Sequence, residues 1–100
     1  MTNYITLKNN NRLNTLATRL QVIGDANRLK IVCAIHNHAG ICVSEISKSL
    51  NLHIATVSHH LQTLSKAGLL TQKRAGKKIC YSLSNNSFIK DLKYLICKCK

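Results

Sequence analysis

The stretch VSEISKSLNLHIATVSHHLQTLSKAGLL, residues 43–70, decides the fold. It contains two runs of apolar residues at helical spacing, and only residues 51–53 separate the two runs. The apolar positions are Val43, Ile46 and Leu50 in the first run, and Val57, Leu61 and Leu64 in the second. Gly68 is a suitable C-terminal stop for the second helix, predicted over 54–67. Two short helices joined so tightly are typical of a helix-turn-helix.

Two more helices are expected upstream of this motif. The first runs from about Asn11 to Gly24 and carries apolar residues at helical spacing. Asp25 is a suitable N-cap for the second, which extends to about His36 and is apolar nearly all round. A helix of that kind belongs at the centre of a domain.

Downstream, the pattern predicts a β-hairpin and a last helix. The strands are expected at 69–72 and 79–83, and the tip between them carries Lys73, Arg74, Lys77 and Lys78. Ser87 is a suitable cap for a helix whose apolar stripe is Phe88, Ile89, Leu92, Leu95 and Ile96. The order of elements predicts an α+β fold that is mainly α, a winged helix-turn-helix with five helices and a two-stranded β wing.

The chain is expected to form one domain. Residues 1–10 are polar, Asn-rich and aperiodic, and we expect a flexible N-terminal arm there, followed by the winged domain over 11–100. No apolar run approaches the roughly 18 residues of a membrane span, and the first residues lack the apolar core of a signal peptide. These features predict a cytoplasmic location and no membrane partner.

The charge is strongly one-sided. Lys and Arg number 15 against three acidic residues, which gives a net charge of +12. Such a balance favours a polyanionic partner, nucleic acid before an anionic membrane, because cations placed on phosphates release condensed counterions. Three acids, with no Ser/His/Asp or Gly-rich phosphate motif, argue against an enzyme, and no cofactor is expected.

The helix predicted over 54–67 presents a polar face opposite its apolar stripe. Hydroxyl, amide and imidazole groups in its first half are suited to a DNA major groove, and the hairpin cations are suited to phosphates. The alternatives to DNA binding are an ordinary solvated helix face and a hairpin that only adds solubility. The candidate DNA-contacting residues are Ala55, Thr56, Ser58, His59, Gln62, Thr63, Lys73, Arg74, Lys77 and Lys78.

Two segments resemble the ArsR family of winged-helix transcriptional repressors. LQVIGDANRLKI, residues 20–31, is similar to the family's LKALGDPTRLKIL opening, and residues 55–61 with 67–70 are similar to its recognition helix and exit segment. The resemblance covers about residues 12–99. It implies a homodimer through the first and last helices that binds double-stranded DNA at a palindromic operator and releases it on sensing a small inducer. His53, Ile54 and Ala55 replace a Ser-Gln-Ser of relatives, so the operator sequence does not transfer.

The resemblance also directs attention to the five cysteines. The family's third-helix metal motif, Cys-Val-Cys-Asp-x-Cys, keeps only Cys42 of its three thiols, and no histidine follows Leu83 for a terminal-helix zinc site. Cys33 resembles the first cysteine of the persulfide- and redox-sensing subgroup exemplified by BigR, SqrR and HlyU. The implied partner is Cys97 or Cys99, and bridging the pair by persulfide or oxidant would lower operator affinity.

Other readings of the cysteines stay open. Cys97 and Cys99, with Cys33 or Cys42, are also suited to bind As(III) or another thiophilic metal ion. A nucleoid-type DNA-binding protein that responds to no inducer is the alternative from another class. Cys42 and Cys80 are interpreted as structural, and His36 and His38 as packing and turn residues.

Overall fold

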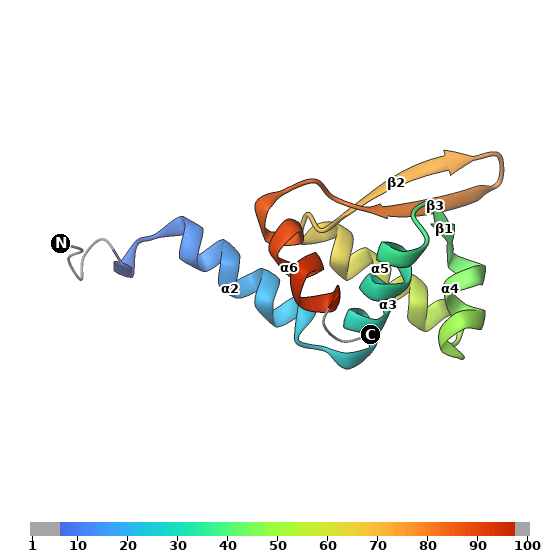
Figure 1. Ribbon diagram of the computed structural model, residues 1–100, viewed down its shortest axis with the longest axis horizontal. Helices are drawn as coiled ribbons and strands as arrows, with labels where there is room; N and C mark the ends of the chain where they lie inside the picture. Colours follow the sequence, from blue (N-terminus) through green and yellow to red (C-terminus); the bar gives the residue numbers. More distant parts are fainter. Residues whose placement is uncertain (1–6, 98–100) are drawn as a thin grey trace.

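A computed structural model describes residues 7–97 of the chain (Figure 1). Over residues 11–97 it contains five helices and a three-stranded sheet, which confirms the predicted winged helix-turn-helix. The elements are α2 (Asn11–Ile23), α3 (Ala26–Asn37), β1 (Ile41–Cys42), α4 (Val43–Leu50), α5 (Ile54–Lys66), β2 (Leu70–Ala75), β3 (Lys78–Leu83) and α6 (Ser87–Cys97). Of the predicted N-terminal arm, Leu7 and Lys8 are helical, and residues 1–6 lie outside the described residues.

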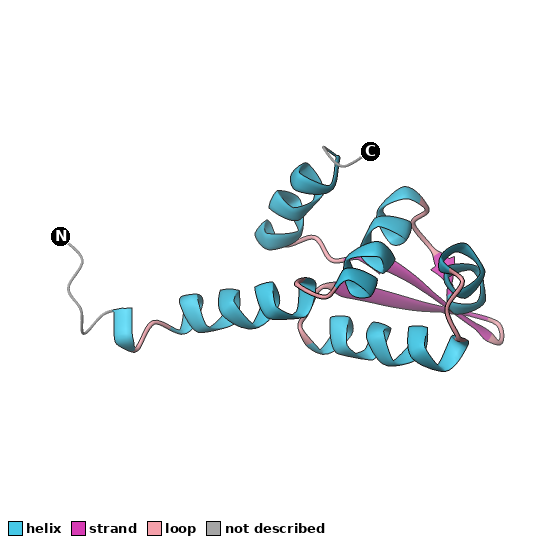
Figure 2. Ribbon diagram, turned by 90° about the horizontal axis from the view of Figure 1, so that it is seen from below, coloured by secondary structure: helices cyan, strands magenta, loops and turns pink. Residues whose placement is uncertain are grey.

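The core forms around α3, which packs against α2, α4, α5 and β3 (Figure 2). Ile31, Val32 and Ile35 of this helix are buried, as the prediction of a central helix requires. The predicted apolar residues of the helix-turn-helix pack against the core, with Val43 and Leu50 half-buried and the others fully buried. Their fully buried members are Ile46 in α4 and Val57, Leu61 and Leu64 in α5. The helical periodicity therefore identified the inward faces of both helices correctly.

Caps account for where the helices begin and end. The Asp25 carboxylate accepts a hydrogen bond from the Arg28 backbone N–H at 2.9 Å, which confirms Asp25 as the cap of α3. Gly68, with φ of 75°, follows the end of α5 as expected. The predicted cap of α6 was wrong by one residue. Asn86 Oδ1 accepts from the Ile89 N–H at 2.9 Å, and Ser87 is already the first residue of the helix.

The sheet is larger than the two-stranded wing that the sequence predicted. A two-residue strand, β1, pairs antiparallel with β3 and makes the strand order β1-β3-β2. Two residues are too few to show the alternation that marks a strand, so the pattern did not reveal β1. Strands β2 and β3 also run further toward the tip than predicted, because the turn itself is short and Gly76 adopts a φ of 64°.

Helix α2 projects from the body of the molecule (Figures 1 and 2). The radius of gyration is 15.1 Å, compared with about 13 Å for a compact domain of this length. The apolar stripe of α2 stays open, since Leu13, Leu16 and Leu20 are 41–54% exposed. On the predicted apolar stripe of α6, Ile89, Leu92 and Ile96 are buried, whereas Leu95 is 61% exposed in the single chain. The helices described here are all too short or too polar to span a membrane.

Candidate nucleic-acid interface and thiol groups

The polar face of α5 is open to solvent. Ala55, Thr56, His59 and Gln62 are exposed, and Ser58 and Thr63 are half-buried. The Thr63 hydroxyl donates to the His59 carbonyl oxygen at 3.1 Å, which leaves the His59 ring and the Gln62 amide as the larger polar groups on this face. These groups stand where the sequence predicted them.

The wing carries its cations along the strands as well as at the turn. Lys73, Arg74, Lys77 and Lys78 are all exposed. Lys73 lies opposite Cys80 in the β2–β3 register and Arg74 lies opposite Ile79. Because successive side chains of a strand alternate, Lys73 and Arg74 project from opposite faces of the wing. The wing therefore offers positive charge on both faces and at its end.

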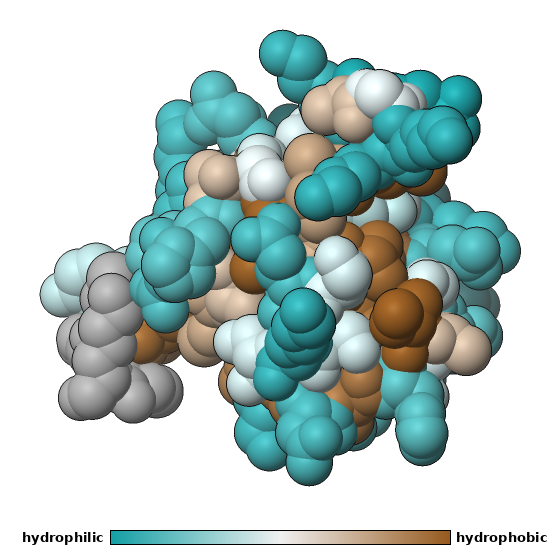
Figure 3. Space-filling view, turned by 90° about the vertical axis from the view of Figure 1, so that its right-hand side faces the viewer, coloured by the Kyte–Doolittle hydropathy of each residue, from teal (hydrophilic) through white to brown (hydrophobic). Residues whose placement is uncertain are grey.

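A shallow cleft of about 280 Å³ joins the wing to the helix-turn-helix. Lys77 and Lys78 line it from the wing, Ile54 and Ser58 from α5, and Val43 and Ser44 from the start of α4. Figure 3 looks at the end of the molecule that carries α4 and the wing tip, and shows hydrophobic surface framed by hydrophilic side chains. The sequence predicted the α5 groups and the wing cations separately, and the structure brings Ser58 and two of the cations to one cleft.

An arginine at the start of α3 ties the scaffold to α5. Arg28 Nε donates to the Val22 carbonyl oxygen at 2.6 Å, and Arg28 Nη1 lies 3.4 Å from His60 Nδ1. The pKa of Asp25 is lowered, chiefly by the hydrogen bond from the Arg28 backbone N–H and further by the positive charges of Arg28 and His60. The contact between Arg28 and His60 joins residues 32 positions apart, so no local pattern in the sequence reveals it.

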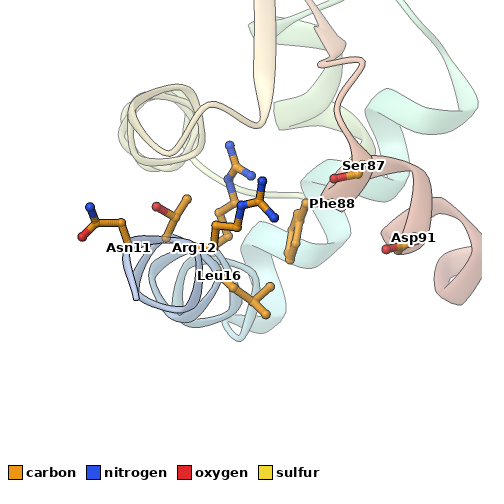
Figure 4. Close-up of a pocket in the computed structure, with 8 residues that line it drawn as sticks. Asn11, Arg12, Leu16, Ser87, Phe88 and Asp91 are labelled. Carbon is orange, nitrogen blue, oxygen red and sulfur yellow. The ribbon is translucent and has the colours of Figure 1, made fainter. Parts of the chain in front are cut away.

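Helices α2 and α6 line a larger cleft of about 660 Å³ (Figure 4). Arg19 crosses it with its guanidinium carbon 5.9 Å from the centre of the Phe88 ring, and Arg19 Nε donates to the Ala67 carbonyl oxygen at 3.3 Å. Leu16 on α2 lies opposite Phe88 in this view. The two helices that the resemblance assigns to a dimer interface therefore border one cleft in the single chain.

The cysteines of the predicted sensing pair are only partly described. Cys33 is half-buried on α3 and lines a cavity of about 440 Å³ between α3 and α4, together with Leu29 and Leu50. Cys97 is the last residue of α6. The Cys97 side chain and the whole of Cys99 lie outside the part of the chain that the structure describes. The pairing of Cys33 with either of them stays a prediction.

The other two cysteines meet directly. Cys42 and Cys80 are register partners in β1 and β3, and their Sγ atoms are 3.2 Å apart. The Cys42 backbone N–H also donates to Glu45 Oε1 at 3.1 Å. The hydrogen bond with Cys80 raises the pKa of the Cys42 thiol to about 11, and the Glu45 carboxylate and burial act in the same direction. The sequence does not reveal this contact, because it depends on the short strand β1.

The described side chains form no cluster suited to a metal ion. Among them, no group of three or more His, Cys, Asp or Glu residues could hold a metal ion. Ser44 and Ser47 stand where the resembled motif has its second and third thiols. His36 is half-buried on α3, and His38 caps its C-terminus. A three-thiol site in this chain therefore requires Cys97 or Cys99.

The helix-turn-helix, the three-stranded sheet with its basic wing and the open polar face of α5 define a winged helix-turn-helix protein. A family model described as "Bacterial regulatory protein, arsR family" matches residues 25–72. The transcriptional repressor PagR of Bacillus anthracis is 33% identical, with a TM-score of 0.73 over 84% of this chain and 95% of that chain. The chain belongs to the arsR family. Membership in a family of regulatory proteins agrees with the expectation that the chain is not an enzyme.

Two further relatives are informative. The cadmium resistance transcriptional regulatory protein CadC of Listeria innocua serovar 6a is 37% identical over 75 residues, which is 75% of this chain and 58% of CadC. The chain thus spans 58% of the length of this curated relative. HlyU from Vibrio cholerae N16961 superposes with a TM-score of 0.82 at 23% identity, over 91% of this chain and 99% of that chain, and this likeness concerns the fold.

Proposed function

We propose that the protein is a homodimeric, DNA-binding transcriptional repressor. The observation that carries the proposal is the cleft in which Ser58 of α5 faces Lys77 and Lys78 of the wing. No Asp or Glu occurs between Glu45 and Asp91, so no acidic side chain of α5 or the wing repels phosphate there.

The two surfaces have different tasks in this proposal. The exposed side chains of α5, with Gln62 and His59 foremost, enter the major groove and contact base edges, as amide and imidazole groups can. The wing cations lie along the adjacent backbone and bind phosphate, which positions the helix without reading sequence. Ile54, 56% exposed at the start of α5, adds an apolar contact for a thymine methyl.

A second copy of the chain completes the molecule in this proposal. Leu13, Leu16 and Leu20 expose their side chains on the projecting helix α2, and Tyr94 and Leu95 do so on α6. A row of exposed leucines on a helix that extends from the body is costly for a monomer in water. Pairing of two chains through α2 and α6 covers these residues and presents two α5 helices to a palindromic site.

The DNA-binding part is tested by selection from a random duplex library, followed by fluorescence anisotropy on the selected duplex and on a scrambled one. Binding of the selected duplex at least tenfold tighter than the scrambled one supports a sequence-specific repressor. Gln62→Ala is expected to reduce that ratio, whereas Lys90→Ala on α6 is the matched variant expected to leave it unchanged. Equal binding to both duplexes would indicate a nucleoid-type protein instead.

The inducer in this proposal acts on thiols, and a thiophilic ion is its first candidate. The curated relatives that align over most of this chain include CadC proteins, whose name ties them to cadmium resistance. Cys97 and Cys99 with Cys33 or Cys42 supply enough sulfur ligands for As(III) or Cd(II). The relatives support this candidate better than they support persulfide sensing.

Persulfide or oxidant sensing through Cys33 with Cys97 or Cys99 is the second candidate. Cys33 is half-buried rather than fully enclosed and borders a cavity lined by Leu29 and Leu50, so a small sulfur species can reach it. The high structural similarity to HlyU concerns the fold and does not separate the two candidates.

Intact mass and operator affinity after separate treatment with Cd(II), As(III), a persulfide donor and hydrogen peroxide separate the candidates. A bound ion with loss of DNA affinity supports the metal sensor. A Cys33 bridge to Cys97 or Cys99 with the same loss supports the persulfide sensor. Unchanged affinity in every arm would refute an inducer-controlled repressor.

A further inference from the structure

Cys42 and Cys80 face each other across the two strands that join the helix-turn-helix to the wing. We propose that this pair is a reversible oxidation site, at which a peroxide converts two thiols into an intrachain disulfide between β1 and β3. This site needs neither Cys33 nor the terminal cysteines, so it is compatible with persulfide sensing and with a metal site that takes Cys33 as its third thiol.

The geometry is suited to that bond. The Sγ atoms are already 3.2 Å apart, so they need to approach by little more than 1 Å to reach the about 2.05 Å of a disulfide. Direct partners on antiparallel strands have Cα atoms about 4.5–5.5 Å apart, within the about 4.4–6.8 Å that disulfides span. Bond formation therefore requires side-chain rotation and no rearrangement of the strands.

The pair can be reached from solvent. Cys42 is 8% exposed, yet it lines the cleft between α4, α5 and the wing. Cys80 is half-buried and is the more exposed of the two. The cleft opens to Cys42 and not to Cys80, and the first attack is assigned to Cys80 because it is the more exposed sulfur.

The disulfide between Cys42 and Cys80 forms in two steps. The Cys80 sulfur attacks one peroxide oxygen, the O–O bond breaks, and the products are a Cys80 sulfenic acid and one water. The Cys42 sulfur then displaces the sulfenic hydroxyl, which takes up a proton and leaves as a second water. Two thiols lose two electrons and two protons in total, and the peroxide is reduced to two waters.

The surroundings of Cys42 fit the role of the second, resolving sulfur. Cys42 is only 8% exposed and Cys80 is half-buried, so peroxide meets Cys80 first and Cys42 is the sulfur held in reserve at 3.2 Å. The Glu45 carboxylate, held beside Cys42 by the hydrogen bond from the Cys42 backbone N–H, can pass the Cys42 proton to the departing hydroxyl.

The test uses the chain of residues 1–100 with Cys33→Ser, Cys97→Ser and Cys99→Ser, which leaves only the proposed pair. After treatment with hydrogen peroxide, we expect a mass loss of two hydrogens per chain, reversed by dithiothreitol. After alkylation and trypsin digestion, peptide 31–48 should be linked to peptide 79–90. Adding Cys80→Ser to this chain is the matched control, and it should give no link.

The single variant Cys33→Ser repeats the test with the terminal cysteines present and guards against misfolding of the triple variant. Cys33 is replaced because it shares peptide 31–48 with Cys42. The same link between peptides 31–48 and 79–90 supports the proposal. Recovery of both peptides with alkylated thiols, or a link found only between two chains, would overturn it.

Discussion

Arg28 Nε donates a hydrogen bond to the carbonyl oxygen of Val22 over 2.6 Å, and so connects the start of α3 to the last turn of α2. The same guanidinium lies 3.4 Å from His60 on α5. Helix ends leave carbonyl groups without partners, and a charged donor is a strong way to satisfy one of them. Arg28 thereby sets the position of the projecting helix relative to the helix-turn-helix.

Replacing Arg28 with Met should destabilise the fold while keeping most of the side-chain volume. The loss of a half-buried hydrogen bond from a charged donor predicts a decrease of about 1.5–3 kcal/mol in the free energy of unfolding. Urea denaturation followed by circular dichroism measures it. Lys30→Met, an exposed change on the same helix, should stay within about 0.5 kcal/mol. Equal midpoints for the two variants would show that the Arg28 contact contributes nothing.

Asp25 predicts a specific dependence of stability on pH. Its pKa is lowered in the folded chain, first by the hydrogen bond from the Arg28 backbone N–H. The ionised carboxylate therefore stabilises the fold above its ordinary pKa of 3.8, and this contribution is lost as the pH falls through the lowered value. Asp25→Asn keeps a capping side chain but cannot ionise. Its unfolding free energy should fall less than that of the wild type on acidification below about pH 4.

Glu45 should contribute to the same loss of stability at low pH. Its pKa is lowered by the hydrogen bonds from the Cys42 backbone and side chain, so it contributes with the same sign. The two carboxylates cap different helices, so their effects should add. The double variant Asp25→Asn, Glu45→Gln should lose less unfolding free energy on acidification than either single variant. If the unfolding free energies of the wild type and Asp25→Asn fall equally as the pH is lowered, the assigned role of Asp25 is contradicted.

The wing cations should control affinity for DNA without controlling sequence preference. Replacing Lys77 and Lys78 together by Ala should weaken binding to selected and scrambled duplexes alike. It should also reduce the slope of log affinity against log salt concentration by up to about 2, since each phosphate contact contributes about 0.9. Anisotropy titrations at several salt concentrations give the slope. An unchanged slope would remove the wing from the DNA interface.

The sequence predicted the helices well because their signal is local. In α5, the spacing of Val57, Leu61 and Leu64 alone identified the inward face, and all three are fully buried. The caps were less certain where two capping residues stand together, as Asn86 and Ser87 do, because either can accept the first-turn N–H groups. Leu95 fits the apolar spacing of α6 and is exposed in the single chain, as the prediction of a stripe left for a second chain allows.

In the candidate site, too, the features that depend on local sequence were predicted and those that depend on long-range pairing were not. The polar face of α5 and the wing cations follow from residue type and spacing, and the structure leaves them exposed as predicted. The meeting of Cys42 with Cys80 depends on pairing between segments far apart in the chain. A strand of two residues has no periodicity to detect, so only the folded sheet reveals that these thiols are neighbours.

The exposed leucines of α2 give the last prediction, which concerns assembly. Leu20 is 54% exposed on the projecting helix, beside Leu13 and Leu16, and we expect a second chain to cover it. Leu20→Glu would place a charge in that contact, and an unpaired buried carboxylate costs several kcal/mol. The dimer dissociation constant should rise by more than about 100-fold, which corresponds to about 3 kcal/mol. Leu29→Glu, at an exposed position on α3, should leave it unchanged. Sedimentation equilibrium distinguishes the cases, and a Leu20→Glu variant as dimeric as the wild type would exclude α2 from the interface.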